Sequence, residues 1–214
     1  NLMCRQGVTP DLARAIMRTN TTAIGAVMVN RDEADSIICG TFGEFRWHMN
    51  YIKQVLGREA FHPVGALSMM ILEDGPLFIT DTQVHLHPKP EEIAKIAVGA
   101  ARHVRRFGIE PNIAFCSQSQ FGNHGNGSGW RLREAIKILD AEGHDFCYEG
   151  EMNIDTALDP DLRQRLFPGN RMKGPANVLV FAHADAASGV RNILKMKPIT
   201  RSHSFKFIST CSQH

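Results

Sequence analysis

The 214-residue sequence has no apolar stretch long enough to span a bilayer and little surplus of either charge. A spanning helix needs about 20 predominantly apolar residues, and Asn1–Cys4 does not begin a signal peptide. The formal net charge of +2 gives no general attraction to nucleic acid or to an anionic membrane. We therefore expect no nucleic-acid partner and no membrane partner, and any basic site must be local.

Cysteine is too sparse and too scattered for a disulfide framework. The chain has five cysteines, an odd number, and none forms a short paired spacing. Such a pattern is typical of reduced thiols. We therefore predict a cytoplasmic protein in which all five cysteines are reduced. They are Cys4, Cys39, Cys116, Cys147 and Cys211.

Several catalytic motifs are also absent. The glycine spacing of the loop at residues 117–129 is neither GxGxxG nor GxxxxGK[ST], so it indicates neither a Rossmann nor a P-loop site. No GxSxG and no Ser–His–Asp arrangement appears, which leaves covalent hydrolase chemistry unsupported. With 43% hydrophobic and 21% charged residues, the chain nevertheless has the composition of a packed globular protein.

The second half of the chain alternates short apolar runs with helical patterns. Strands are predicted at 113–117, from 146 and at 177–181, and helices at 91–107, 129–140, from 159 to before Pro168, and 185–196. This order favours an α/β fold with a mainly parallel sheet covered by helices on both faces.

The first half is more varied. Helices are predicted at 10–17, where Thr9 precedes Pro10, and at 47–56. The apolar run 23–29 predicts a buried strand, and 34–39 a short strand or the entry to a helix. Asp74-Gly75 between the apolar runs 66–72 and 77–80 predicts a hairpin. We place part of a first α/β subdomain at 1–89, a second at 90–196, and an atypical tail at 197–214.

The most informative segment is the serine- and glycine-rich loop at 117–129, between a predicted strand and a predicted helix. Glycine lets a backbone approach a ligand, and free N–H groups of a first helical turn point toward anions. The segment predicts either a site for a phosphorylated ligand or plain turn chemistry. The candidate binding residues are Ser117, Ser119, Asn126, Gly127, Ser128 and Gly129.

Other candidates lie outside this loop. Glu149, Glu151 and Asp155 follow or end a predicted strand, where carboxylates serve either as bases or as helix caps, and Asp155 is the best catalytic candidate. Arg46 is a candidate phosphate ligand or a solvated surface residue. His85 and His87 favour a surface turn over a metal site because no further ligand pattern completes them, and we expect no metal in this chain.

Six segments in order carry a family resemblance: GVTPDLARAIMR, TTAIGAVMVNRDEADSIICG, LFITDTQVHLHPKPEEIAKIA, RRFGIEPNIAFCSQSQFG, YEGEMNIDTALDP and MKGPANVLVFAHADAASG. Together they resemble the phosphate acetyltransferase and butyryltransferase family over residues 5–196. The resemblance is closest to the transferase-like C-terminal domain of large bacterial NADP-dependent malic enzymes.

The resemblance implies two α/β subdomains with a cleft that binds coenzyme A or acetyl-CoA, as in phosphate acetyltransferases of the isocitrate/isopropylmalate dehydrogenase-like type. It implies Arg46 at the phosphate or acyl end, and a carboxylate that deprotonates the thiol of coenzyme A. In malic enzymes it implies a regulatory and oligomerising module, with NADP and a divalent metal in other domains. A homodimer or larger homo-oligomer is expected.

The sequence departs from the family pattern at both ends. The Ser-Arg pair and aspartate of active members do not follow Met196, and the start of the N-terminal subdomain does not precede Asn1. The fold is therefore expected to be incomplete at both ends. Three alternatives stay open: a regulatory acyl-CoA-binding module, an active phosphate acyltransferase, and an inactive product folded only around 90–196.

Overall fold

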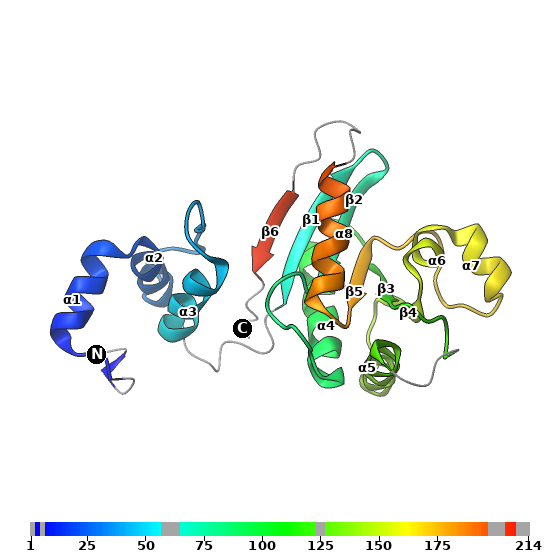
Figure 1. The fold of residues 1–214 in the computed structure, drawn as a ribbon, viewed down its shortest axis with the longest axis horizontal. Coiled ribbons are helices and arrows are strands. Elements are labelled where there is room, and N and C mark those ends of the chain that lie inside the picture. The colour runs from blue at the N-terminus through cyan, green and yellow to red at the C-terminus, as the bar shows by residue number, and fades with distance from the viewer. Residues whose placement is uncertain (1–2, 5–6, 57–64, 123–126, 197–203, 209–214) are drawn as a thin grey trace. The chain divides into compact units, whose positions relative to one another are not determined.

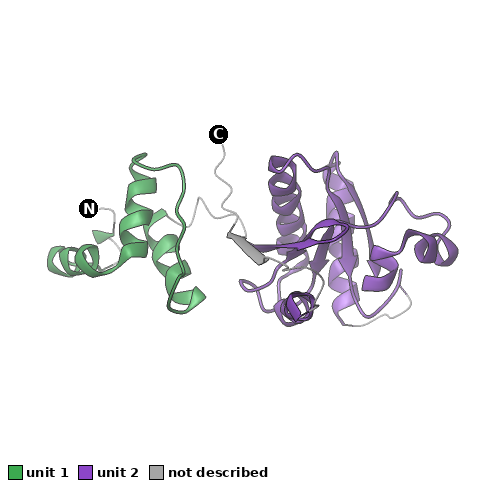
Figure 2. Cartoon of the chain, turned by 90° about the horizontal axis from the view of Figure 1, so that it is seen from above, with its two compact units in different colours: residues 1–62, 210–214 green, residues 63–209 purple. Residues whose placement is uncertain are grey.

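The computed structural model describes residues 3–4, 7–56, 65–122, 127–196 and 204–208 (Figure 1). The chain forms two compact units, residues 1–62 with 210–214 and residues 63–209, which are coloured separately in Figure 2. Within the described residues no helix is both long and apolar enough to cross a membrane.

The described part of the first unit is helical. It contains α1 (Pro10–Thr19), α2 (Thr21–Asn30) and α3 (Phe45–Leu56). Thr9 caps α1 as predicted, because its hydroxyl accepts a hydrogen bond from the Leu12 amide at 3.3 Å. The helix predicted at 47–56 is confirmed as α3.

The strand predicted at 23–29 is wrong, because these residues belong to α2. Asn20 accepts a hydrogen bond from the Ala23 amide at 2.9 Å and so caps this helix. Ala23 and Ala26 are buried, and a short buried apolar run has the same pattern in a helix as in a strand. Residues 34–39, predicted as a short strand or helix entry, form neither.

The second unit is built on a six-stranded sheet with the order β4-β3-β5-β2-β1-β6. Strands β4, β3, β5 and β2 are parallel, whereas β1 is antiparallel to β2 and to β6. The strands are β1 (Ala66–Leu72), β2 (Gly75–Thr80), β3 (Asn112–Cys116), β4 (Cys147–Met152), β5 (Val178–Phe181) and β6 (Ser204–Ile208).

Helices cover both faces of this sheet, as the sequence predicts. In the central strand β5, Val178 and Val180 pack into the core beneath α4 and α5, while Leu179 and Phe181 pack with α6 and α8 on the opposite face. All four are buried, which explains the continuous apolar run. The helices are α4 (Pro90–Arg106), α5 (Ser128–Glu142), α6 (Ile154–Leu158), α7 (Pro160–Leu166) and α8 (Ala184–Met196) (Figure 1).

The predicted hairpin is confirmed and belongs to the second unit. Leu72 pairs with Gly75 across the turn, and Gly75 has a φ of 118° that favours glycine. β2 then pairs with β5 in parallel, so the hairpin extends the main sheet. The two compact units divide between residues 62 and 63. The subdomains that the sequence analysis placed at 1–89 and 90–196 stay a prediction.

The atypical tail contains one strand of this sheet. β6 pairs with β1, with Ile208 opposite Ala66 and Ser204 opposite Met70. Residues 204–208 of the atypical tail therefore belong to the sheet of the second unit.

Candidate functional site

The serine- and glycine-rich loop connects the carboxyl end of β3 to the start of α5. The Ser117 amide donates to the Met152 carbonyl at 2.9 Å, which ties the start of the loop to β4. Gly127 precedes the helix with a φ of 97°, a conformation that glycine adopts readily. The first amides of a helix have no acceptor within the helix and point beyond its N-terminal end, where an anion can accept hydrogen bonds from them.

Serine hydroxyls join the two ends of the loop. The Ser117 Oγ atom lies 3.3 Å from Ser119 Oγ and 3.4 Å from Ser128 Oγ. Ser117 and Ser128 are half-buried, whereas Ser119 is buried. The structure thus brings Ser117, Ser119, Gly127, Ser128 and Gly129 together, as predicted, while Asn126 lies outside the described residues.

A buried carboxylate supports this loop from below. Glu151 Oε1 accepts hydrogen bonds from Ser119 Oγ at 2.7 Å, the Gly122 amide at 3.0 Å and an Arg133 nitrogen at 2.7 Å. Glu151 is 0% exposed, and its Oε2 has no hydrogen-bond partner among the described residues. The sequence identified Glu151 only as one member of an acidic cluster, because its partners are 18 to 32 residues away.

Gly129 leaves the space that this arrangement needs. A Cβ atom at this position would collide with Ser119 Oγ and would lie 3.3 Å from Glu151 Oε1. The absence of a side chain therefore lets the first turn of α5 pack directly on the Ser119–Glu151 pair.

A surface hollow of about 480 Å³ lies next to the loop. It is lined by Gln120, Phe121 and Gly122 from the loop and by Leu166 and Phe167 at the end of α7. The Phe121 and Phe167 rings are in contact, with centroids 3.7 Å apart and their planes tilted by 33°. Small polar groups of the loop thus adjoin an apolar wall, the combination that ligand sites commonly present.

Asp155, the predicted catalytic residue, is exposed in the first turn of α6. Its Oδ1 accepts from the Thr156 amide at 2.7 Å. Thr156 in turn contacts Gln120 of the loop at 3.4 Å, so α6 adjoins the candidate site. The catalytic role of Asp155 stays a prediction.

Arg46 is exposed in the first turn of α3 and belongs to the first compact unit. Its proposed contact with phosphate therefore stays a prediction as well. Cys116 is buried, and burial raises the pKa of its thiol. It is therefore a packing residue of β3 and not a nucleophile.

His85 and His87 do not form a joint metal site. His85 Nδ1 lies 2.9 Å from Asp81 Oδ2, and His87 Nδ1 lies 2.9 Å from His183 Nδ1. Among the described residues no group of three or more histidine, cysteine, aspartate or glutamate side chains is placed to hold a metal ion.

Asp81 organises the connection after β2. Its two oxygens accept from the backbone amides of Ala66, Gln83, Val84 and His85 at 2.8–3.0 Å. Burial by itself would raise the pKa of Asp81, but the bonds from His85 and from the amides outweigh it and lower that pKa.

The sequence missed one basic cluster at the carboxyl ends of the strands. His183 follows β5, and its ring contacts His87 and Arg131. His183 lies two residues after the predicted parallel strand 177–181. Positions just after such strands face ligand crevices, so this position could have identified His183 as a candidate.

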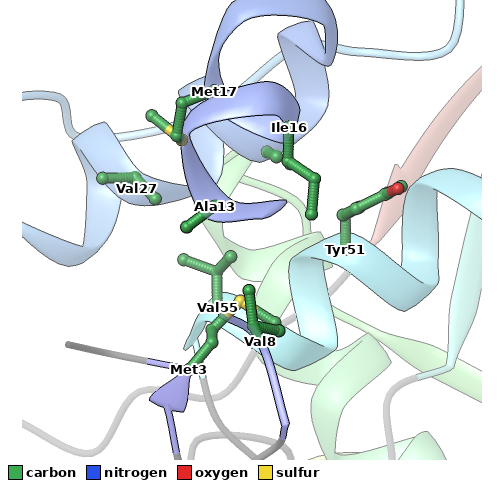
Figure 3. Close-up of a pocket in the computed structure, with 9 residues that line it drawn as sticks. Met3, Val8, Ala13, Ile16, Met17, Val27, Tyr51 and Val55 are labelled. Carbon is green, nitrogen blue, oxygen red and sulfur yellow. The ribbon is translucent and has the colours of Figure 1, made fainter. Parts of the chain in front are cut away.

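A separate hollow of about 180 Å³ lies within the helical unit (Figure 3). Its wall is apolar, and the hydroxyl of Tyr51 points away from the other labelled side chains. This hollow offers little to a phosphorylated ligand. Its lining residues are Met3, Val8, Ala13, Ile16, Met17, Ala23, Val27, Tyr51 and Val55.

The parallel sheet defines an α/β protein, and its polar loop and helix start lie at the carboxyl ends of the strands, where ligand sites of such sheets usually lie. The family model described as phosphate acetyl/butaryl transferase matches residues 1–197. The chain belongs to this family, as the sequence resemblance predicts.

Two curated relatives and one solved structure show the range of similarity. The chain is 42% identical to the NADP-dependent malic enzyme of Salmonella typhimurium over 91% of its own length. It is 32% identical to the phosphate acetyltransferase of Synechocystis over 82% of its length. It spans about a quarter of these two relatives, 26% and 25%.

The fold matches that of a phosphotransacetylase from Streptococcus pyogenes with a TM-score of 0.86 and 21% identity. This match covers 98% of the present chain and 64% of the solved chain. It confirms the fold class that the sequence predicts.

Proposed function

We propose that this chain is the acyl-CoA-binding, regulatory and oligomerising module of an NADP-dependent malic enzyme. Malate oxidation, NADP and a divalent metal would belong to other domains of such an enzyme. The identity of 42% to a malic enzyme, compared with 32% to a phosphate acetyltransferase, favours this reading.

The observation that carries the ligand assignment is the loop at the end of β3. Ser117 and Ser128 offer two hydroxyls 3.4 Å apart beside the first amides of α5, which have no acceptor within the helix. The buried Glu151 fixes the position of this loop, and the missing side chain of Gly129 leaves room for the Ser119–Glu151 contact. These groups suit the phosphate groups of coenzyme A, and the hollow at Phe121 and Phe167 suits an apolar part of the ligand.

Calorimetric titration of the intact full-length protein with acetyl-CoA and coenzyme A tests the assignment. We expect saturable binding to the wild type and weaker binding to Gly129→Ala. We also expect malate oxidation to respond to acetyl-CoA in the wild type. Heat and a thermal shift from neither ligand would reject the proposal.

Regulatory action through an oligomer requires that the chain assemble. We propose a homodimer or larger homo-oligomer located in the cytoplasm, where the free thiols of Cys39, Cys116 and Cys147 are stable. Light scattering of the intact protein with and without acetyl-CoA measures this state. A monomer under both conditions would contradict the assembly role.

The alternative is an active phosphate acyltransferase, which the family match and the Synechocystis relative favour. In that reaction the coenzyme A sulfur attacks the carbonyl carbon of acetyl phosphate. The new S–C bond replaces the C–O bond, and phosphate leaves. Asp155 would take the thiol proton, while the serine hydroxyls would stabilise the developing charge. The family resemblance implies a charge-stabilising role for Arg46 as well.

Turnover of acetyl phosphate that depends on coenzyme A decides between the two functions. Loss of that turnover in Asp155→Asn, with retained coenzyme A binding, would establish the transferase and its base. Binding without turnover would support the regulatory module.

A further inference from the structure

Three basic side chains meet where the β2–α4 connection, the end of β5 and the first turn of α5 converge. An Arg131 nitrogen lies 2.7 Å from His183 Nε2, and another donates to the Pro88 carbonyl at 3.0 Å. His87 and His183 approach through their Nδ1 atoms at 2.9 Å, with ring centroids 4.9 Å apart.

The hydrogen-bond roles in this cluster follow from the guanidinium group, which can only donate. His183 Nε2 must therefore accept from Arg131. A neutral His183 then carries its proton on Nδ1 and donates it to His87 Nδ1, so the proton of a neutral His87 is on Nε2. The two acceptor nitrogens, His183 Nε2 and His87 Nδ1, are therefore both engaged in hydrogen bonds within the cluster. The groups that remain for a ligand are hydrogen-bond donors, namely His87 Nε2–H and the other N–H groups of Arg131.

The cluster has little compensating negative charge among the described residues. The hydrogen bonds described for Arg131 go to a carbonyl and an imidazole, and not to a carboxylate. Burial, with the charges of Arg131 and His87, lowers the pKa of His183. Asp185 of α8 and a backbone bond with Leu86 act in the opposite direction but do not reverse this.

The cluster adjoins the serine side of the candidate site. Arg131 is three residues after Ser128 in α5, so the two side chains lie on the same helix face. Ser128 Oγ contacts Ser117 Oγ. A strip of hydroxyl, guanidinium and imidazole donors therefore runs along the carboxyl ends of β3, β5 and β2.

We propose that Arg131, His183 and His87 form a proton-coupled binding site for a phosphate-like dianion. The anion accepts from Arg131 and from His183 Nε2, which takes up one proton as the Arg131–His183 bond is replaced. A bound dianion favours the charged imidazole, so affinity rises as the pH falls.

The anion has two chemical sources, free phosphate or a phosphate group of a larger ligand such as coenzyme A. The site for free phosphate does not depend on the proposed function. Only the competition experiment with acetyl-CoA rests on the proposed function. The anion site and the proposed function can therefore be rejected independently of each other.

The test is calorimetric titration of the intact protein with sulfate, which keeps its charge between pH 5 and 8, followed by inorganic phosphate. Titrations at pH 7.5 and 5.5, in buffers of different ionisation enthalpy, measure both affinity and proton uptake. The variants are Arg131→Gln and His183→Asn. Lys137→Gln is the matched control, since it removes one charge from an exposed position of the same helix.

We expect sulfate affinity to rise about fivefold or more from pH 7.5 to 5.5, with proton uptake. Arg131→Gln should weaken binding about tenfold, and Lys137→Gln should leave it near the wild-type value. His183→Asn should bind with no proton uptake. Circular dichroism and thermal unfolding without anion confirm that each variant is folded.

Absence of saturable binding to the wild type, equal losses in Arg131→Gln and Lys137→Gln, or unchanged proton uptake in His183→Asn would each overturn the proposal. Competition by acetyl-CoA would identify the coenzyme as the source of the phosphate group. Sulfate binding without competition would assign the site to a free anion.

Discussion

One buried carboxylate determines the shape of the loop after β3. Glu151 is 0% exposed, and its Oε1 atom alone accepts the hydrogen bonds from Ser119, the Gly122 amide and Arg133. A buried charge left without its partner is costly, so each of these groups depends on the others.

Glu151→Gln removes the negative charge opposite Arg133 while keeping the size of the side chain. We expect a loss of roughly 3 kcal/mol in the free energy of unfolding and weaker binding of acetyl-CoA. Urea denaturation measures the first effect and calorimetry the second. The exposed Glu142→Gln is the control, and equal stability of the two variants would contradict this role.

Gly129→Ala tests the space beside Ser119. The added methyl group would displace Ser119 and weaken its bond to Glu151. Overpacking costs about 1–3 kcal/mol, and the weakened Ser119–Glu151 bond adds to this cost, whereas the gain in helix propensity is about 1 kcal/mol. Denaturation should therefore show a net loss, whereas Gly169→Ala, where the added methyl group meets nothing within 4 Å, should not match it.

Asp81→Asn tests the pH dependence of stability. Because the folded-state pKa of Asp81 is lowered, its contribution is present above the unfolded pKa of about 3.9 and is lost as the pH falls through the folded pKa. The stability difference between wild type and variant should be large at pH 7 and shrink below about pH 4. Urea denaturation across this range measures it, with the exposed Asp35→Asn as control.

The serine residues of the site were predictable because they are consecutive with a strand and a helix start. Their partners were not. Ser119 and Glu151 are 32 residues apart, and His87 and His183 are 96 apart. Such pairs arise only when parallel strands bring their carboxyl ends together.

At the scale of elements, α6, α7 and the segment before β5 are joined by one arginine. Arg163 is 1% exposed. It donates to the carbonyls of Thr156, Ala157 and Gly174 and to Asn170 Oδ1 at 2.5–3.1 Å. The positions of the short helices α6 and α7 therefore depend on the several N–H donors of the Arg163 guanidinium group. A lysine ammonium does not have this planar, forked arrangement of donors.

Arg163→Lys should destabilise the protein by about 2–4 kcal/mol, because several buried carbonyls lose their donor. The exposed Arg165→Lys makes the same chemical change two residues away and should have little effect. Hydrogen exchange should show faster opening of residues 154–174 in the first variant only. Equal protection in both would show that Arg163 is not the connecting group.

The sequence predicted the elements of the second unit better than those of the first. Strands β3 and β5 and helices α4, α5 and α8 have strong periodic patterns between clear turn signals. In α2, the residues 23–29 are apolar throughout, and only the cap at Asn20 distinguishes a helix from a strand. α6 was not predicted, because five residues are too few to show a helical period.

At the scale of the whole chain, the sheet combines a parallel part with an antiparallel edge. β1 lies between β2 and β6, so β6 covers the outer side of the hairpin. An uncovered edge strand offers free backbone groups to other chains.

Removal of residues 197–214 should therefore promote association of the protein through β1, since the pairing of Ala66–Met70 with β6 is lost. Removal of residues 209–214 alone keeps β6 and serves as the control. Light scattering at increasing concentration distinguishes the two. If both truncated proteins remain at the wild-type size, the edge is not protected by β6.

The pairing of β1 with β6 also bears on how the molecule is made. Residue 66 bonds to residue 208, so this contact waits until about 140 further residues have left the ribosome. During that interval the hairpin of β1 and β2 can already form, whereas the other edge of β1 has no pairing strand. Contacts between residues so far apart in the sequence slow folding. Nascent chains on adjacent ribosomes can meanwhile pair with the same unpaired edge of β1.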